Sequence, residues 1–355
     1  MSHLNPWRGK RVFITGVCGT VGGELIRQLV EIGPAEIVGI DNNESEIFFL
    51  RRTYGAHGNV RMYIGDVREQ VSLKSKMAGA DVVIHTAAFK HVEICESSPR
   101  ETVANNVLGI QNVIEAAKDC DVSRVLFTSS DKAVNPTSVM GTTKLLGERL
   151  MAAADVTTLG ERPMFASTRF GNVLGSRGSV IPLFTKQILS GGPVTITDPT
   201  MTRFIMSLNE AVKLVMNSVF VARGGEVFVT KMPTVRIEDL ASVMIEELAP
   251  CIGKEPAEIP IKVIGTKPGE KLYEELLNEE EVRRTVELED YFVVLPALRP
   301  IAAQRIGEYE GFVRDHVDVP YNSANRPAMD REQLRSFLRE HRLVDVADGQ
   351  PIAAS

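Results

Sequence analysis

The chain has 355 residues, of which 44% are hydrophobic and 24% are charged, and its formal net charge is −6. Such a composition is typical of a globular protein that buries one large core and a smaller second one. The acidic balance excludes an extended basic surface, so nucleic acid is not an expected partner and bound phosphate must be held by a few local cations.

Membrane spans, disulfides and metal sites are not expected either. No apolar stretch is long enough to cross a bilayer, and the first ten residues lack the apolar segment of a signal peptide. The four cysteines, Cys18, Cys95, Cys120 and Cys251, are scattered and form no CxxC pair. These features favour a cytoplasmic protein with reduced thiols and no metal.

Short β-branched runs alternate with amphipathic helical stretches over the first third of the chain. Helical patterns cover Glu24–Ile32 and Thr102–Cys120. This alternation predicts an α/β fold with a doubly wound parallel sheet, the Rossmann architecture. The predicted strands are Arg11–Thr15, Glu36–Ile40, Val60–Ile64, Val82–Thr86 and Arg124–Thr128.

The composition of the sequence changes after Phe170. Glycine and proline become frequent there, as in FGNVLGSRGSVIP and SGGPVTITDP. We therefore expect a dinucleotide-binding domain over residues 1–170. A smaller α/β substrate-binding domain, interleaved with the last strands of the sheet, is expected over 171–320. A C-terminal helix at Arg331–Arg339 and a tail are expected within 321–355.

The segment VFITGVCGTVGGELIRQLV spaces three glycines between a predicted strand and a predicted helix. Glycine there allows a tight turn, close approach of the backbone to a pyrophosphate and close packing of helix on strand, while the helix N-terminus offers free N–H groups. This context predicts a dinucleotide site. The residues expected to contact the cofactor are Gly16, Gly19, Thr20, Val21 and Gly22.

Acidic residues follow the second and third predicted strands. Asp41 ends the second strand, where a carboxylate can accept hydrogen bonds from the adenosine ribose and repel a 2′-phosphate, which favours NAD over NADP. Asp41-Asn42-Asn43 is also good turn chemistry, so a turn role stays open. Asp66 and Val67 after the third strand, and Ala87 after the fourth, are also expected at the cofactor, although Asp66 would serve a loop equally well.

The stretch TSSDKAVNPTSVMGTTK follows the fifth predicted strand and is dense in reactive groups. It carries Ser129, Ser130, Asp131 and Lys132, and then Lys144 on the next predicted helix. Side chains at the carboxyl end of a parallel strand project toward the cofactor crevice. A solvated loop that caps a helix would have a similar composition, but an acid beside an amine at this edge favours catalysis.

Ordered motifs along nearly the whole chain carry a family resemblance. They are TGxxGxxG, HTAAFKHVEICE, NNVLG, TSSDKAV with MGTTK, RFGNVLGSRGSVIPLF, DPTMTRFIM and KPGEKLYEEL. In these motifs the chain resembles the extended short-chain dehydrogenase/reductases, and more narrowly the nucleotide-sugar 4,6-dehydratases of the CapD-like polysaccharide-biosynthesis group. The resemblance runs from Arg8 to Leu295 and implies a UDP-sugar substrate, NAD as cofactor and a homo-oligomer.

One position departs from the superfamily pattern. Most members carry a Tyr-x-x-x-Lys pair, and here Met140 occupies the tyrosine position four residues before Lys144. A thioether can neither take nor give a proton, so the usual tyrosine base is in doubt. Some members of the dehydratase group are similar in having methionine there, and the resemblance still implies that Lys144 hydrogen-bonds the nicotinamide ribose and supplies positive charge.

The resemblance implies an internal redox cycle on UDP-N-acetylglucosamine for surface-glycan synthesis: NAD oxidises C4, water leaves across C5 and C6, and the hydride returns to C6. A C4 ketone acidifies the C5 hydrogen, so a base is needed at C5 and an acid at the C6 hydroxyl. We predict Asp131 as the acid and Lys132 as the base, with its pKa lowered by burial and by Lys144. Ser129 and Ser130 are expected to hydrogen-bond the developing C4 carbonyl. The acceptor of the C4 hydroxyl proton stays open between Asp131, Lys132 and a water.

Six further residues are expected at the nucleotide sugar: Lys90, Asn172, Arg177, Arg203, Lys267 and Glu270. The lysine in AAFKHVE and the asparagine in RFGNVLG resemble the family's substrate-facing positions. The two arginines and Lys267 are isolated cations suited to gripping a diphosphate, with a surface ion pair as the alternative for each arginine. Glu270 resembles a family residue near the nucleotide, or it caps the helix that follows.

Two other functions stay open. A nucleotide-sugar 4-epimerase would share the fold and the cofactor but would need no acid for a C6 hydroxyl, so the Asp131-Lys132 pair argues against it. A non-catalytic dinucleotide-binding protein is the third possibility, and only Met140 argues for it.

Overall fold

The computed structural model describes residues 5–158, 162–267, 269–297, 306–347 and 350–351. The chain divides into two compact units. The first, which we call the sheet unit, comprises Met1–Phe170, Val212–Lys231 and Leu277–Pro320. The second unit comprises Gly171–Ala211, Met232–Leu276 and Tyr321–Ser355.

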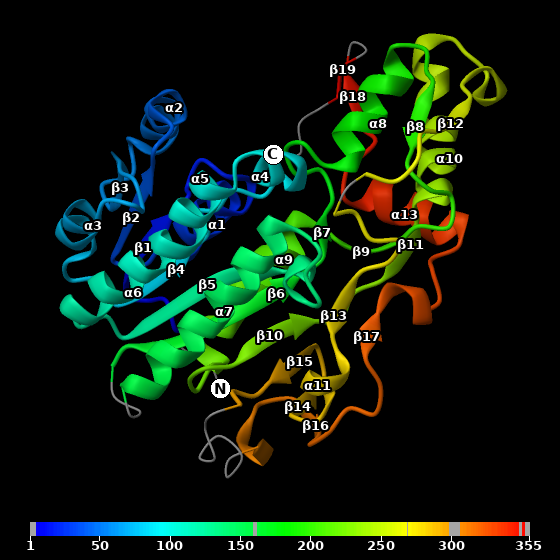
Figure 1. Cartoon of the computed structure of the whole chain (residues 1–355). Coiled ribbons are helices and arrows are strands. Elements are labelled where there is room, and N and C mark those ends of the chain that lie inside the picture. Colours follow the sequence, from blue (N-terminus) through cyan, green and yellow to red (C-terminus); the bar gives the residue numbers. More distant parts are fainter. Residues whose placement is uncertain (1–4, 159–161, 268, 298–305, 348–349, 352–355) are drawn as a thin grey trace. The chain divides into compact units, whose positions relative to one another are not determined.

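One ten-stranded sheet forms the centre of the sheet unit (Figure 1). Its strands are β1 (Arg11–Thr15), β2 (Glu36–Asp41), β3 (Val60–Ile64), β4 (Val82–His85), β5 (Arg124–Ser130), β6 (Met164–Phe170), β10 (Val227–Thr230), β14 (Thr285–Leu288), β15 (Tyr291–Val294) and β16 (Phe312–Arg314). Their order across the sheet is β16-β14-β15-β10-β6-β5-β4-β1-β2-β3. The strands from β3 to β10 in this order are parallel, and β15, β14 and β16 continue the sheet antiparallel.

Helices cover the inner part of the sheet because the strands there are buried on both faces. They are α1 (Thr20–Ile32), α2 (Glu44–Tyr54), α3 (Gln70–Met77), α4 (Val92–Ser97), α5 (Pro99–Val103), α6 (Gly109–Asp119), α7 (Val139–Thr157), α9 (Leu208–Val221), which begins in the second unit, and α11 (Glu279–Val282). Phe13, Val83 and Phe127 share a core cluster with α3, α6 and α7. The alternate strand residues, such as Ile14 and Ile84, are also fully buried, as a sheet covered on both faces requires.

The strand order reverses at β1, the third strand from one edge of the sheet, which lies between β2 and β4. In doubly wound sheets, ligands bind at such a switch point, in the crevice outside the carboxyl ends of the strands. The segments that leave β1, β2, β3 and β4 at this edge are the ones in which the sequence predicts the cofactor residues.

The second unit has its own core, built from small sheets and three helices. Its elements are β7 (Asn172–Val173), α8 (Val180–Leu189), β8 (Val194–Ile196), β9 (Thr202–Met206), β11 (Thr234–Arg236), α10 (Ile237–Leu248), β12 (Ile261–Val263), β13 (Glu275–Leu277, which ends in the sheet unit), β17 (Tyr321–Asn322), α13 (Arg331–Glu340), β18 (Val346–Ala347) and β19 (Gln350–Pro351). Strands β11, β9 and β7 form one sheet, and β12 pairs with β8. Leu240, Met244 and Leu338 lie in the core that α8, α10 and α13 share.

The predicted fold class is confirmed, and the predicted strands form within two residues of their expected ends. One predicted helix is not continuous: the stretch 102–120 is divided into the end of α5, a π-helix at Ala104–Leu108 and α6. The division of the chain also differs from the expected one, because 212–231 and 277–320 group with the sheet unit while 321–355 groups with the second unit. Among the described residues, no helix combines the length and apolar character needed to span a membrane.

Candidate active site

The glycine turn after β1 is held by backbone hydrogen bonds. The N–H groups of Gly16 and Val17 donate to the carbonyl of Ile40 on β2, and the Gly19 N–H donates to the Gly16 carbonyl at 3.0 Å. Gly16 has a φ of +74°, and a Cβ atom there would lie 2.6 Å from the backbone nitrogen of Ala87. The backbone of the turn after β1 therefore packs directly against the backbone of the segment after β4.

The first turn of α1 offers backbone N–H groups at this edge. Gly19 is its N-cap and supplies no side chain to cap the helix. Gly22 packs so closely that a Cβ atom there would lie 2.2 Å from the Gly16 carbonyl oxygen. Thr20 and Val21 are half-buried beside it. This cradle fits a dinucleotide, because N–H groups at a helix N-terminus bind a pyrophosphate and only glycine lets the backbone come so close.

A hollow opens next to this turn. Its lining comes from the ends of β1, β2, β3 and β4 and from the π-helix: Gly16, Gly19, Ile40, Asp41, Asn42, Gly65, Asp66, Val67, Thr86, Ala87, Ala88, Phe89 and Asn105. Gly16, Gly19, Asp41, Asp66, Val67 and Ala87, six residues that the sequence predicts at the cofactor, thus line one hollow.

The Asp41 carboxylate connects β2 to the glycine turn. Its Oδ2 accepts the Cys18 N–H at 3.0 Å, and its Oδ1 accepts the Asn43 N–H at 3.0 Å. A carboxylate oxygen has two acceptor sites, so this side chain keeps capacity for ribose hydroxyls. The turn role that the sequence left open and the cofactor role are therefore compatible.

Asp66 is held by its own neighbour. Its carboxylate accepts two side-chain N–H groups of Arg68, at 2.9 and 2.6 Å, and the Arg68 backbone N–H at 2.9 Å. The hydrogen bonds from Arg68 lower the pKa of Asp66 to about 2. Asp66 therefore stays ionised in the hollow, and its first role is to hold the loop after β3.

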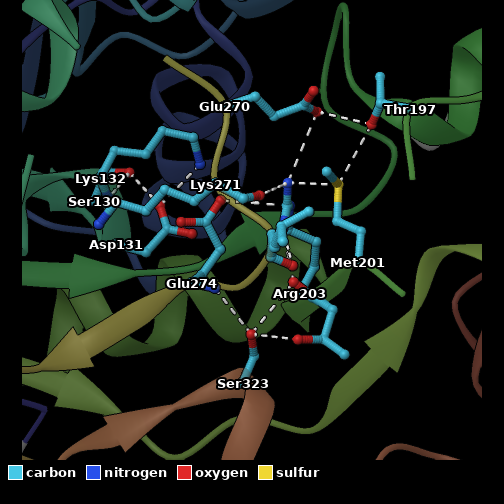
Figure 2. A network of polar contacts seen from close by, with 12 residues as sticks. Ser130, Asp131, Lys132, Thr197, Met201, Arg203, Glu270, Lys271, Glu274 and Ser323 are labelled. Carbon is cyan, nitrogen blue, oxygen red and sulfur yellow. Dashed lines mark hydrogen bonds and ion pairs between the residues drawn. The ribbon is translucent and has the colours of Figure 1, made fainter. Parts of the chain in front are cut away.

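The catalytic candidates meet at the carboxyl end of β5. Asp131 Oδ1 accepts the Ser130 hydroxyl at 2.6 Å and Lys132 Nζ at 3.0 Å (Figure 2). The Asp131 side chain is 1% exposed, whereas that of Lys132 is 28% exposed. Asp131 Oδ2 and the Ser129 hydroxyl are buried and have no hydrogen-bond partner among the described residues. Buried polar atoms of this kind are normally satisfied, so they point to a ligand or water that completes the site.

Lys144 lies buried behind this edge. Its Nζ donates to the Thr128 carbonyl of β5 at 2.9 Å and lies 4.8 Å from the centre of the Phe127 ring. Burial lowers the pKa of Lys144 to about 8, with Glu148 and Cys95 acting in the opposite direction. Met140, in the place of the usual tyrosine, is 3% exposed, and its side chain offers no proton.

His85 was not among the site residues predicted from the sequence. It ends β4 beside the hollow. Its Nδ1 lies 2.7 Å from the Thr15 hydroxyl, and its ring stacks on Phe127. Burial and the charge of Lys144 lower the pKa of His85 to about 3, so the ring is neutral at physiological pH. Its Nε2 has no hydrogen-bond partner in the described part of the chain.

The NNVLG motif forms the π-helix and fixes the segment after β4. Asn106 accepts the Phe89 N–H at 2.8 Å and donates to the Phe89 carbonyl at 3.0 Å and to the Thr143 hydroxyl at 3.1 Å. Both asparagines are buried, and Asn105 lines the hollow. π-Bulges are frequent at functional sites, and this one ties the hollow to the helix that carries Lys144.

The substrate candidates are spread over both units. Lys90 is exposed in the sheet unit. In the second unit, Asn172 is half-buried on β7, and Arg177 and Lys267 are exposed in loops. The structure therefore places the cofactor and catalytic candidates within the sheet unit, and it places all the substrate candidates except Lys90 within the second unit.

Backbone carbonyls and carboxylates of the second unit hold the Arg203 side chain. Its guanidinium donates to the Thr202 carbonyl at 2.8 Å and to the Lys271 carbonyl at 2.8 Å (Figure 2). It also pairs with Glu274 at 3.4 Å and with Glu270 at 3.8 Å. Only 7% of the residue is exposed. This geometry favours a structural role for Arg203, joining β9 to the loop 270–274, over a grip on a diphosphate.

Glu270 belongs to the same cluster. Its Oε1 accepts the Thr197 hydroxyl at 3.2 Å, and its Oε2 accepts the Lys267 N–H at 3.2 Å. The second contact stabilises the loop that precedes it rather than a following helix. No group of histidine, cysteine, aspartate or glutamate side chains suited to a metal ion is found in the ranges that the structure describes.

Comparison with known proteins decides the family. The model of the family described as polysaccharide biosynthesis protein matches residues 12–296. The chain belongs to this family. Among its relatives, the uncharacterized membrane protein MJ1061 of Methanocaldococcus jannaschii is 46% identical over 95% of this chain and 97% of that protein.

Two functionally named relatives match over almost their whole length. A UDP-N-acetylglucosamine 4,6-dehydratase (inverting) of Campylobacter jejuni is 34% identical over 92% of this chain and 97% of that enzyme. A UDP-glucose 4-epimerase of Rickettsia canadensis is 36% identical over 93% of this chain and 95% of that enzyme. Among solved structures, Pen from Bacillus thuringiensis is 39% identical, with a TM-score of 0.88 over 95% of this chain and 99% of Pen. The protein is thus an enzyme of the nucleotide-sugar dehydratase and epimerase group.

Proposed function

We propose that this enzyme removes water from UDP-N-acetylglucosamine to give the 4-keto-6-deoxy sugar, with NAD as its cofactor, for polysaccharide synthesis. The observation that carries the proposal is the Asp131–Lys132 pair, 3.0 Å between Nζ and Oδ1, at the carboxyl end of β5. Elimination of water needs an acid and a base close together, and this pair supplies both. The named dehydratase among the relatives supports the same reading.

The proposal assigns cofactor contacts to residues of the hollow, to the first turn of α1 and to Lys144. The N–H groups of the first turn of α1 would hold the pyrophosphate, Asp41 would hold the adenosine ribose, and Lys144 would hold the nicotinamide ribose. When bound, NAD supplies a reversible acceptor for the hydride that leaves C4 and returns to C6. A positive Lys144 beside the nicotinamide favours the removal of that hydride electrostatically.

We expect Asp41→Ala to weaken NAD binding by about tenfold, from the loss of about 1.5 kcal/mol in hydrogen bonds to a charged acceptor. NADP binding should be weakened less, because the same change removes a charge that repels the 2′-phosphate. Calorimetric titration of the wild-type enzyme and of Asp41→Ala with NAD and with NADP measures these affinities. An equal loss for NAD and NADP would remove Asp41 from the ribose site.

The acid and the base of the proposal exchange one proton. A proton shift from Lys132 Nζ to Asp131 Oδ1 converts the ion pair into a neutral carboxylic acid and a free amine. The amine takes the C5 proton while the acid donates its proton to the departing C6 hydroxyl, and the pair returns to its charged form. As the hydride reaches C6, Lys132 Nζ returns its proton to C5, and the proton that left the C4 hydroxyl restores the charged form of the pair.

The C4 end of the reaction uses the serines. Ser129 donates a hydrogen bond to the developing C4 carbonyl, and Ser130 does so when its hydroxyl turns away from Asp131 Oδ1. The C4 hydroxyl proton passes to Asp131, to Lys132 or through a water, since Met140 cannot accept it. Lys90, Asn172, Arg177, Lys267 and Glu270 remain the proposed contacts of the UDP-sugar, on the strength of the family motifs. Arg203 is proposed to shape the Glu270 loop.

The test is incubation of the purified enzyme with UDP-N-acetylglucosamine, followed by mass analysis of the nucleotide sugar. Loss of one water is the expected result. An unchanged mass together with a C4 epimer would make the enzyme a 4-epimerase, the second candidate, which the Rickettsia relative favours. An epimerase needs no acid at C6, so the buried Asp131 argues for dehydration.

A further inference from the structure

A buried triad of charged side chains lies directly behind the catalytic edge. Arg169 is completely buried and makes two hydrogen bonds to Glu148, at 3.0 and 2.6 Å, and two to Glu281, at 2.9 and 3.0 Å. The carboxyl side chains are 4% and 3% exposed. Nothing in the proposed chemistry uses these residues.

The triad joins three segments that position the site. Arg169 on β6 is the register partner of Ser129 on β5. Glu148 lies on α7 four residues after Lys144, so the two side chains project from the same face of that helix. Glu281 belongs to α11, whose first turn is fixed by a capping box with Asn278.

Charge balance explains why such a costly arrangement is kept. Two carboxylates around one guanidinium leave one net negative charge in the interior, which is unfavourable by itself. Lys144 is buried one helical turn away and carries the opposite charge. The four groups together are neutral when Lys144 is protonated, and Arg284 also acts on the charge of Glu281.

The directions of the pKa shifts agree with this geometry. Burial lowers the pKa of Lys144 to about 8, and Glu148 holds it up against that effect. Burial would raise the pKa of Glu281, but Arg169 keeps it below its usual value. The other titratable groups that act on or respond to Lys144 are Cys95 on α4 and the neutral His85 on β4.

We propose that the Glu148–Arg169–Glu281 triad positions Lys144 and keeps it positively charged, as a buried counter-charge that acts from behind the cofactor crevice. Glu148 is the shared member, because it contacts Arg169 and also faces Lys144. Arg169 occupies the Glu148 carboxylate, so Glu148 does not pair directly with Lys144. The Lys144 Nζ therefore donates to the Thr128 carbonyl, and β5 orients it. These are positioning residues, and none is proposed to touch the substrate. The value of a charged Lys144 rests on the proposed function.

The test is a direct titration of Lys144 in the full-length enzyme. The ε-carbon resonance of ¹³C-labelled lysine is followed from pH 6 to 10, and the Lys144 signal is assigned by its loss in Lys144→Met. The wild-type midpoint is expected at about 8. Glu148→Gln should lower it by one pH unit or more, a tenfold loss of proton affinity, and Glu281→Gln by less because its charge is farther along the triad. Both changes keep the shape of the side chain and an acceptor for Arg169.

Two controls separate this role from a purely structural one. Asp155→Asn removes another buried carboxylate of α7, one that accepts the Phe165 N–H, and should lower stability without moving the Lys144 midpoint. Glu148→Asp keeps the charge and should restore most of the midpoint. If Glu148→Gln does not fold, Glu281→Gln decides, since it retains the Arg169–Glu148 pair.

The proposal is overturned if the Lys144 midpoint does not move in the folded glutamine variants. It is also overturned if Asp155→Asn shifts that midpoint as much as Glu148→Gln does. Because the titration needs no substrate, its outcome is separate from the identity of the reaction. If the proposed function holds as well, the alkaline limb of the turnover profile moves down in parallel with the midpoint, since charge on Lys144 is lost as the pH rises through its pKa.

Discussion

Replacing Asp131 by asparagine is expected to lower turnover of UDP-N-acetylglucosamine by about 10²–10⁴-fold, the usual contribution of a general acid. Asparagine keeps the size of the side chain and can still accept from Ser130. It can neither take the proton of Lys132 nor donate it to a leaving hydroxyl. Steady-state turnover measured by water loss, beside calorimetric NAD binding, checks the prediction, and NAD affinity should change little.

Lys132→Ala should cause a loss of turnover of similar size, because the base and the acid act as one pair. The matched control for Asp131→Asn is Asp121→Asn. It makes the same Asp→Asn change near the opposite end of β5. Asp121 is exposed and has a φ of 51°, a conformation that asparagine tolerates well, so turnover should be unaffected. An Asp131→Asn enzyme that retains wild-type turnover would show that the acid is a different group.

The second large effect is expected at Gly22. A Cβ atom there would lie 2.2 Å from the Gly16 carbonyl oxygen and 2.8 Å from the Val17 Cα, so α1 must move away from the turn after β1. We expect Gly22→Ala to lower the free energy of unfolding by about 1–3 kcal/mol, as overpacking does. The same displacement spoils the pyrophosphate cradle, so NAD affinity should fall by at least about tenfold, or 1.4 kcal/mol.

Gly23→Ala is the matched control, because it makes the same change at the next position of the same helix. A Cβ atom at Gly23 would lie 3.7 Å from the Val17 carbonyl oxygen, an ordinary contact. Alanine is favoured over glycine within a helix, so this variant should be as stable as the wild type or up to about 1 kcal/mol more stable. Chemical denaturation and NAD titration of both variants supply the comparison. Equal behaviour of the two would mean that close packing at Gly22 does not shape the cofactor cradle.

Local sequence signals were sufficient for the strands and for the glycine turn. The strands are short β-branched runs, and the spacing of Gly16, Gly19 and Gly22 acquires meaning from the strand before it and the helix after it. The position of Asp131 and Lys132 at the end of β5 follows from the same argument, since the carboxyl ends of parallel strands share one edge of the sheet.

The interruption of the helix near Asn106 could not be predicted in this way. Its apolar spacing is helical throughout, and the π-helix exists because Asn106 bonds the Phe89 backbone, 17 residues away. A local sequence pattern cannot predict a contact between residues so far apart in the chain. The NNVLG motif was visible as a family feature, but its buried asparagines carried no sign of what they bind.

The charged residues were the hardest to assign. Arg203 read as an isolated cation, yet the fold surrounds it with carbonyls and carboxylates from the loop 270–274. Arg169 and Glu281 are 112 residues apart, so their pairing has no local signal. The spacing of Lys144 and Glu148 at i and i+4 was the one available clue to the triad.

The most direct measurement of the central claim follows a deuterium label placed at C4 of UDP-N-acetylglucosamine. Dehydration through bound NAD moves the hydrogen of C4 to C6 within one molecule, so we expect NMR of the product to show deuterium in the C6 methyl group and none at C4. Deuterium that stays on, or returns to, C4 of a sugar that has kept its C6 hydroxyl would contradict the proposed dehydration.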